Sequence, residues 1–232
     1  MLFRSDLYEP AVQKWRLPII LSRVHRYACD LNRIPEDIDQ STVEGSPLPE
    51  GKHSTGLHWK HTMHENVLLE KPISRALHDE IVQKYFDPFH ERIIQARTAL
   101  RKRFPAGPLY HLDCHSMPSH PTSMHTDLGK GHRAEVVLSD QDGKTASNVY
   151  REIVGQAFTD EGFQVTWNDP YKGGRITQRY GRPAEQSEII QIELRRDLYM
   201  DERTFEKIPD KYESLQESLS RVISRIVPSL LP

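Results

Sequence analysis

The sequence contains little cysteine and no long apolar run. Only two cysteines occur among the 232 residues, Cys29 and Cys114, and they form no Cys-x-x-Cys pair. This pattern argues against a disulfide framework and against a zinc site built from cysteines. No apolar run is long enough to span a bilayer, and the first residues do not resemble a secretory signal. These absences predict a cytoplasmic protein with no membrane partner.

An excess of charge of one sign is also missing. The chain has 31 Lys and Arg against 33 Asp and Glu, which gives a formal net charge of −2. This balance gives no electrostatic reason to expect a nucleic acid or an anionic membrane as a partner. The sequence also lacks a Gly-x-Ser-x-Gly motif, and its absence argues against a serine hydrolase.

What the sequence does contain is an alternation of predicted strands and helices. Short runs rich in β-branched and aromatic residues predict strands at 16–21, 24–30, 109–114, 134–138, 163–167 and 188–193. Apolar residues at three- and four-residue spacing predict helices at 6–15, 70–103 (broken near Asp87-Pro88), 146–161 and 203–227. This alternation predicts an α/β sandwich with a mostly parallel or mixed sheet. No linker or repeat divides the chain, so we expect a single domain over residues 1–232.

One long segment interrupts this alternation. Residues 34–66 are rich in Pro, Gly, Ser, Asp and His, and they predict a loop that is either functional or disordered. The loop contains a group of histidines, which either contact a metal or substrate or are simply scattered there: His53, His58, His61 and His64.

The central strand carries the most distinctive polar pair. Leu109–Ser119 begins as an apolar run and ends in a polar loop. Residues two apart in a strand share a face, so Asp113 and His115 point one way and Leu112 and Cys114 the other. Two arrangements are expected for these side chains. Either both bind one metal ion, or His115 alone binds the metal and Asp113 orients its ring.

Ser116 follows His115 at the end of the same strand. Further polar groups follow other predicted strands: Asp30 with Asn32 and Arg33, Asn168 with Gly173-Gly174, and Glu193 with Arg195 and Arg196. In a mostly parallel sheet these strand ends would gather at one edge. Glu193 could then act as a general base, and Arg33 and Arg175 could bind a substrate carboxylate. Each group also has a structural interpretation: a salt-bridged strand end for Glu193, a turn for Gly173-Gly174, and an ion pair between Asp30 and Arg33.

Taken together, the motifs resemble the N-formylglutamate amidohydrolase family. They stand in the family's order and cover most of the chain, at Tyr27–Arg33, Leu112–Ser119, Val137–Gly143, Asn168–Gly174 and Ile190–Glu202. The resemblance implies a three-layer α/β/α fold like that of carboxypeptidases and phosphorylase/hydrolase-like enzymes. It also implies a zinc-dependent (or other divalent metal) hydrolase that cleaves N-formyl-L-glutamate, or a related N-acyl amino acid, in histidine degradation.

The resemblance further implies roles for single residues. Asp6 and His115 match the family's metal ligands, and Glu193 matches the glutamate of its Gln-x-Glu motif, the general base. Asn32 and Arg33 match a motif that holds the substrate carboxylate. The remaining residues expected to contact substrate are Asn168, Gly174 and Arg175.

The sequence also departs from the family pattern. We expect the chain to lack the family's opening Pro-His-Ser-Gly segment, whose histidine is a further metal ligand. Pro10 stands at a second acidic position, and Ser139 at a usual glycine. Two alternatives therefore stay open: a peptidoglycan amidase or carboxypeptidase-like hydrolase on the same fold, and a non-catalytic relic that binds a small carboxylated ligand. The sequence does not indicate an oligomeric state.

Overall fold

The computed structural model describes residues 4–231, which form two compact units. Unit 1 comprises residues up to Ile19, Ala106–Pro121 and the chain from Thr126 on. Unit 2 comprises Ile20–Pro105 and Thr122–His125. Each unit has its own apolar core. The expectation of a single domain stays a prediction.

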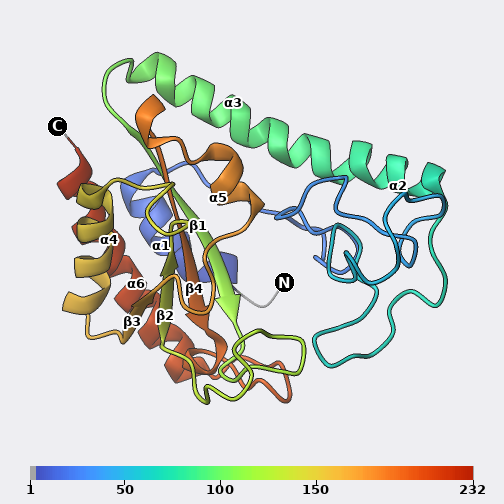
Figure 1. Ribbon diagram of the computed structural model, residues 1–232. Coiled ribbons are helices and arrows are strands. Elements are labelled where there is room, and N and C mark those ends of the chain that lie inside the picture. The colour runs from blue at the N-terminus through green and yellow to red at the C-terminus, as the bar shows by residue number, and fades with distance from the viewer. Residues whose placement is uncertain (1–3, 232) are drawn as a thin grey trace. The chain divides into compact units, whose positions relative to one another are not determined.

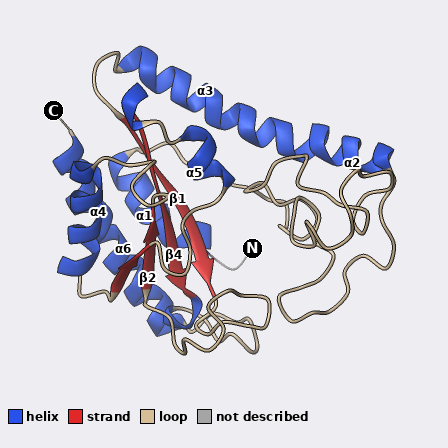
Figure 2. Ribbon diagram, in the orientation of Figure 1, coloured by secondary structure: helices blue, strands red, loops and turns tan. Residues whose placement is uncertain are grey.

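Unit 1 is built on one open, mixed sheet (Figure 2). Its strands are β1 (Leu109–Met117), β2 (Val136–Ser139), β3 (Val165–Trp167) and β4 (Ser187–Arg195), in the order β1-β4-β2-β3. β1 is parallel to β4 and β3 is parallel to β2, but β2 runs antiparallel to β4. The two parallel pairs therefore point in opposite directions.

One face of this sheet is covered by long helices, α1 (Arg4–Trp15), α4 (Asn148–Asp160) and α6 (Pro209–Leu230) (Figure 1). They bury the side chains of Ile190, Ile192 and Leu194 from β4. Alternate strand residues share a face, so this apolar set fixes which side chains of β4 point the other way. Those side chains include Gln191 and Glu193.

The opposite face carries the short helix α5 (Arg175–Tyr180), which packs on β4. Sequence analysis did not predict this helix, because its six residues are too few to show a helical period. Short 3₁₀ turns lie at Pro183–Glu185 and Arg196–Leu198. Helices thus flank an open mixed sheet, and the predicted α/β fold class is confirmed.

Unit 2 contains α2 (Arg75–Ile81), a π turn (Val82–Phe86) and α3 (Asp87–Arg103). The predicted helix at 70–103 is confirmed from Arg75 on, where the Ser74 hydroxyl caps its first turn. The predicted break near Pro88 takes the form of the π turn, in which the Asp87 N–H bonds to the Val82 carbonyl. Proline has no N–H to continue the regular ladder, which explains the change at this point. No helix within residues 4–231 is long and apolar enough to cross a membrane.

The strands predicted at 16–21 and 24–30 are wrong. Both stretches are irregular, and the loop predicted at 34–66 is confirmed apart from isolated bridges. Their backbone groups bond across loops instead: the Asp30 N–H donates to the Leu57 carbonyl, and the Leu57 N–H donates to the Asp37 carbonyl. Cys29 and Leu31 are buried in the core of unit 2. Burial, rather than strand pairing, accounts for the apolar pattern.

Candidate functional site

The first polar pair of unit 1 lies on β1. Asp113 and His115 share a face of the sheet, while Leu112 and Cys114 pack toward the helical core, as predicted. His115 Nε2 lies 3.0 Å from Asp113 Oδ1, and both side chains are largely buried. Through this contact Asp113 can orient the imidazole, and that role stays a prediction. Ser116 lies within β1 rather than after it.

A second polar pair lies on β4 and repeats this arrangement. The Gln191 Nε2 donates a hydrogen bond of 3.1 Å to Glu193 Oε1. In the parallel register Asp113 stands opposite Gln191, and His115 stands opposite Glu193. The four side chains therefore lie on one face of the sheet, with the imidazole beside the carboxylate. An imidazole and a carboxylate side by side, here those of His115 and Glu193, can accept and hold protons during hydrolysis.

Buried charge lies close to Glu193. Arg133 and Asp127 form two hydrogen bonds of 2.8 Å, and both side chains are almost completely buried. The Arg133 guanidinium lies 5.2 Å from the centre of the Tyr171 ring. Burial raises the pKa of the Tyr171 phenol, and the negative charge of Glu193 raises it further, against the opposing effect of Arg133. Sequence analysis missed these three residues because they come from loops that only the fold brings to Glu193.

The loop before α5 contacts Gln191 on the face of the sheet that carries α5. The Gly174 N–H donates to Gln191 Oε1 at 2.9 Å. Gly173 has φ of +103°, and a Cβ there would lie 2.6 Å from Thr177 Oγ1, so the turn needs glycine. Gly174, predicted to contact substrate, thus uses its N–H inside the protein. Arg175 begins α5 and donates to Gln178 at 3.0 Å.

Asn168, another predicted substrate contact, is engaged with Asp140. Its Nδ2 donates to Asp140 Oδ1 at 2.8 Å, and its Oδ1 accepts from the Asp140 N–H at 3.0 Å. Asp140 is fully buried and also accepts from Arg151 at 2.7 Å. The mixed sheet explains the position, because β3 ends at Trp167, level with Leu138 of β2 and Ile192 of β4, and not at the carboxyl end of β4. The expectation that all polar strand ends gather at one edge is therefore wrong for Asn168.

The predicted metal ligands Asp6 and His115 belong to different faces of the sheet. Asp6 lies on α1, the helix that packs against α6, and its side chain is half exposed. Its Oδ2 lies 3.8 Å from Lys207 Nζ. His115 lies on the face that carries Glu193. Among residues 4–231, no three His, Cys, Asp or Glu side chains form a group that could hold a metal ion. A catalytic zinc needs three protein ligands, so these residues do not fit the predicted ion.

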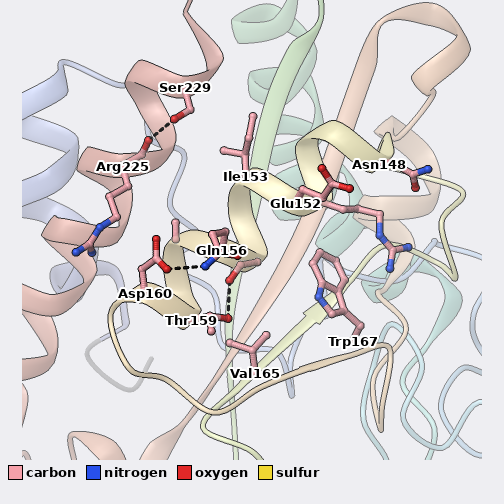
Figure 3. A pocket seen from close by; sticks show the side chains of 13 residues that line it. Asn148, Glu152, Ile153, Gln156, Thr159, Asp160, Val165, Trp167, Arg225 and Ser229 are labelled. Carbon is pink, nitrogen blue, oxygen red and sulfur yellow. Dashed lines mark hydrogen bonds between the residues drawn. The ribbon is translucent and has the colours of Figure 1, made fainter.

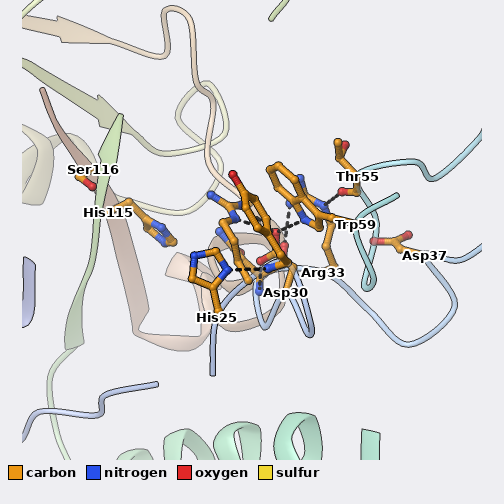
Figure 4. A network of polar contacts seen from close by, with 12 residues as sticks. His25, Asp30, Arg33, Asp37, Thr55, Trp59, His115 and Ser116 are labelled. Carbon is orange, nitrogen blue, oxygen red and sulfur yellow. Dashed lines mark hydrogen bonds and ion pairs between the residues drawn. The ribbon is translucent and has the colours of Figure 1, made fainter. Parts of the chain in front are cut away.

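Unit 2 holds its own polar cluster, around Asp30 (Figure 4). The buried Asp30 carboxylate accepts from Arg26 at 2.7 Å, from the Trp59 Nε1 at 3.2 Å and from the Asn32 N–H at 3.1 Å. Burial alone would raise the pKa of Asp30, but the charges of Arg26 and Arg33 and these hydrogen bonds lower it below the ordinary value. Asp30 thus stays ionised and organises the turn that carries Asn32 and Arg33.

Arg33 itself bonds to backbone rather than to Asp30. Its Nε donates to the Thr55 carbonyl at 3.1 Å, and its Nη1 donates to the Asn32 carbonyl at 3.0 Å (Figure 4). The hydrogen-bonded ion partner of Asp30 is Arg26. The alternative in which Asp30 and Arg33 pair directly is therefore not what the fold uses.

A groove in unit 1 lies away from all of these residues (Figure 3). It is formed by α4, β3 and α6, and Trp167 and Ile153 line it. None of the residues predicted to act on substrate or metal lines it. We therefore place the candidate site at the polar face of β1 and β4.

Comparison with known proteins agrees with the motifs. The family model described as N-formylglutamate amidohydrolase matches residues 2–200. The chain belongs to the N-formylglutamate amidohydrolase family. Its segments around Asp113 and Glu193 both lie inside the matched range.

Individual relatives of the N-formylglutamate amidohydrolase family support this assignment. The chain is 26% identical to an N-formylglutamate deformylase of Pseudomonas putida over 187 residues, 79% of this chain and 64% of the relative. It is 26% identical to one of Pseudomonas aeruginosa over 181 residues, 77% of this chain and 62% of the relative. The chain thus spans less than two thirds of the length of these relatives.

Two crystal structures share the fold. An N-formylglutamate amidohydrolase from Ralstonia eutropha superposes with a TM-score of 0.83 at 29% identity, over 98% of this chain and 82% of that chain. A protein from Agrobacterium tumefaciens gives 0.61 at 17% identity, over 96% and 77% of the two chains. The second likeness concerns the fold alone.

Proposed function

We propose that this protein hydrolyses the amide bond of N-formyl-L-glutamate, or of a related N-acyl amino acid, to release formate or another carboxylate and the free amino acid. Membership of the N-formylglutamate amidohydrolase family supports this activity. The names of the two Pseudomonas relatives and of the Ralstonia structure agree with it. The substrate is thus a small molecule that carries carboxylates.

The observation that carries the proposal is the register of β1 and β4. It sets the His115 imidazole beside the Glu193 carboxylate on one face of the sheet. In the proposed reaction Glu193 accepts a proton from the attacking water and returns it to the leaving amine. Asp113 keeps the His115 ring in one orientation, at 3.0 Å. No step is assigned to a metal, because the described residues do not provide three ligands for one.

Recognition of the substrate carboxylate is assigned to arginines. Guanidinium groups bind carboxylates through parallel hydrogen bonds, and lysine does not reproduce that geometry. Arg33 is the proposed anchor, with Asn32 beside it, and Arg175 at the start of α5 is the second candidate. The backbone bonds of Arg33 hold its side chain in one orientation before substrate arrives.

The test is formate release from N-formyl-L-glutamate by wild type and by Glu193→Gln. Loss of the general base is expected to lower kcat by about 10²- to 10⁴-fold while the fold is retained. Glu188→Gln is the matched control, because Glu188 lies on the same strand but bonds to the Ser147 N–H at the start of α4. Full activity of Glu193→Gln would refute the assigned base, and an inactive wild type would refute the proposed reaction.

A second candidate is a non-catalytic protein that binds a small carboxylated ligand. The observation in its favour is that residues 4–231 form no three-residue metal-ligand group. Calorimetric titration with N-formyl-L-glutamate separates the two functions: saturable binding without any formate release favours the non-catalytic one.

A further inference from the structure

We infer that Gln191 is the positioning residue that fixes the Glu193 carboxylate against the start of α5. Sequence analysis gave Gln191 no role, although it stands two residues before Glu193. The inference rests on the proposed role of Glu193 as general base. Through Gln191, the loop before α5 would set the position of the Glu193 carboxylate.

The orientation of the Gln191 amide follows from its partners. The Gly174 backbone N–H can only donate, so the side-chain atom that faces it at 2.9 Å must be the Gln191 carbonyl oxygen. The Nε2 of the same amide then faces Glu193 Oε1, 3.1 Å away. A carboxylate oxygen accepts this bond well, and the amide therefore holds the Glu193 carboxylate in one rotamer.

The surroundings of Gln191 make this orientation rigid. Its side chain is buried, with 3% of the residue exposed, and its position on β4 is opposite Asp113 on one side and Ser139 on the other. On the far side of the amide, Gly174 is held by Thr177 Oγ1, which donates to its carbonyl at 2.6 Å. A buried amide with two directional bonds has little freedom to turn.

The arrangement repeats what β1 does with its own pair. Asp113 contacts the His115 ring from two residues earlier, as Gln191 contacts Glu193. In a strand, residues at this spacing share a face, so each strand supplies a reacting group together with the group that orients it. A reacting group that is misplaced by about 1 Å can lose roughly 100-fold in rate.

The experiment compares wild type, Gln191→Met, Glu193→Gln and the double variant in the formate assay. Methionine keeps the length of the side chain but removes both hydrogen bonds. Gln191→Met is expected to lower kcat about 10- to 100-fold with KM within twofold of wild type. In the Glu193→Gln background the same substitution is expected to change kcat less than twofold, because its effect acts through Glu193.

Gln141→Met is the matched control. The Gln141 Nε2 donates to the Gly173 carbonyl at 2.6 Å, so this variant loosens the same loop without touching Glu193. It is expected to keep kcat within twofold of wild type. An equal loss in Gln141→Met, or a loss that is additive with Glu193→Gln, would mean that Gln191 merely supports the loop and would overturn the inference.

Crystal structures of wild type and Gln191→Met make the test independent of activity. The Glu193 carboxylate is expected to leave its wild-type position in the variant. An unchanged Glu193 in Gln191→Met refutes the positioning role even if the wild type releases no formate. An inactive wild type in which Glu193 does move refutes the proposed function alone.

Discussion

Asn168 shows, at the scale of the residue, how a polar side chain near a site can serve the fold. Its backbone adopts a left-handed conformation, with φ of +56°, which asparagine tolerates better than most residues. Its amide satisfies both the side chain and the N–H of the fully buried Asp140. The contacts thus give Asn168 a role in the turn after β3, and its contact with substrate stays a prediction.

Asn168→Ala is expected to destabilise the protein by about 1–3 kcal/mol, because it leaves the buried Asp140 N–H without its hydrogen bond. Urea unfolding measures this change through the midpoint. Asn168→Gly is the control, since it removes the same amide but tolerates the positive φ. A variant with wild-type stability and a raised KM would instead support the original prediction that Asn168 binds substrate.

The segment between β1 and β2 illustrates the element scale. Within it, Arg133 bonds to Asp127 and to the Pro118 carbonyl, and its own carbonyl accepts from Arg195 on β4. The buried Arg133 guanidinium therefore holds together the start and the end of the segment that connects β1 to β2. Buried pairs of this kind contribute mainly through the cost of breaking them.

Arg133→Met is expected to lower the free energy of unfolding by about 3–5 kcal/mol, because it removes the guanidinium that compensates the buried Asp127 charge. Chemical denaturation of the purified variant measures the loss. The double variant Asp127→Leu, Arg133→Met should recover part of it, since no buried charge remains. Equal stability of the single and double variants would contradict this explanation.

A histidine pair joins the long loop of unit 2 to α2. His58 Nε2 lies 2.9 Å from His78 Nδ1, and His58 Nδ1 lies 2.8 Å from the Ala28 carbonyl. The carbonyl requires a proton on His58 Nδ1, so in the neutral pair His78 donates to His58. Burial lowers the pKa of both histidines, and Arg75 lowers that of His78 further, against smaller opposite effects of Asp79 and Glu36.

The stability of the protein should therefore fall as the pH drops below about 6.5, the ordinary pKa of histidine. Below that value the unfolded chain binds protons that the folded pair does not, so protonation favours unfolding. The urea midpoint is expected to be lower at pH 5.5 than at pH 7.5.

Variants of His58 and His78 test whether this pair causes the pH dependence of stability. His58→Gln, His78→Leu should be less stable than wild type at pH 7.5 but lose less stability on going to pH 5.5. His64→Gln, which changes an exposed histidine of the same loop, should keep the wild-type slope. A wild-type slope in the double variant would show that other groups are responsible.

At the scale of the whole molecule, the sheet separates the two predicted metal ligands. Purified protein that has been treated with chelator and dialysed against excess zinc is expected to retain well below one zinc per chain. Metal analysis by mass spectrometry measures this directly. Stoichiometric zinc that disappears in both Asp6→Asn and His115→Ala would contradict the expectation and restore the predicted site.

Local patterns in the sequence were sufficient to predict several elements, although they also predicted two strands that do not form, at 16–21 and 24–30. The helices at α1, α4 and α6 follow from apolar residues at helical spacing, and β1 and β4 follow from short apolar runs. The shared face of Asp113 and His115 follows from the two-residue period of a strand. The motifs also identified the family, because five short segments in a fixed order are specific even where each is common.

Only the tertiary structure decided which of these residues meet. The antiparallel pairing of β2 with β4 turns Asn168 away from the common edge, and strand direction is a long-range property that no local pattern encodes. The apolar residues at 24–31 were buried in the core of unit 2 without forming a strand. The position of Gln191 between Gly174 and Glu193 depends on a loop 17 residues away in sequence from Gln191. Local propensity sets the elements, whereas long-range packing and hydrogen bonding select the contacts of the site.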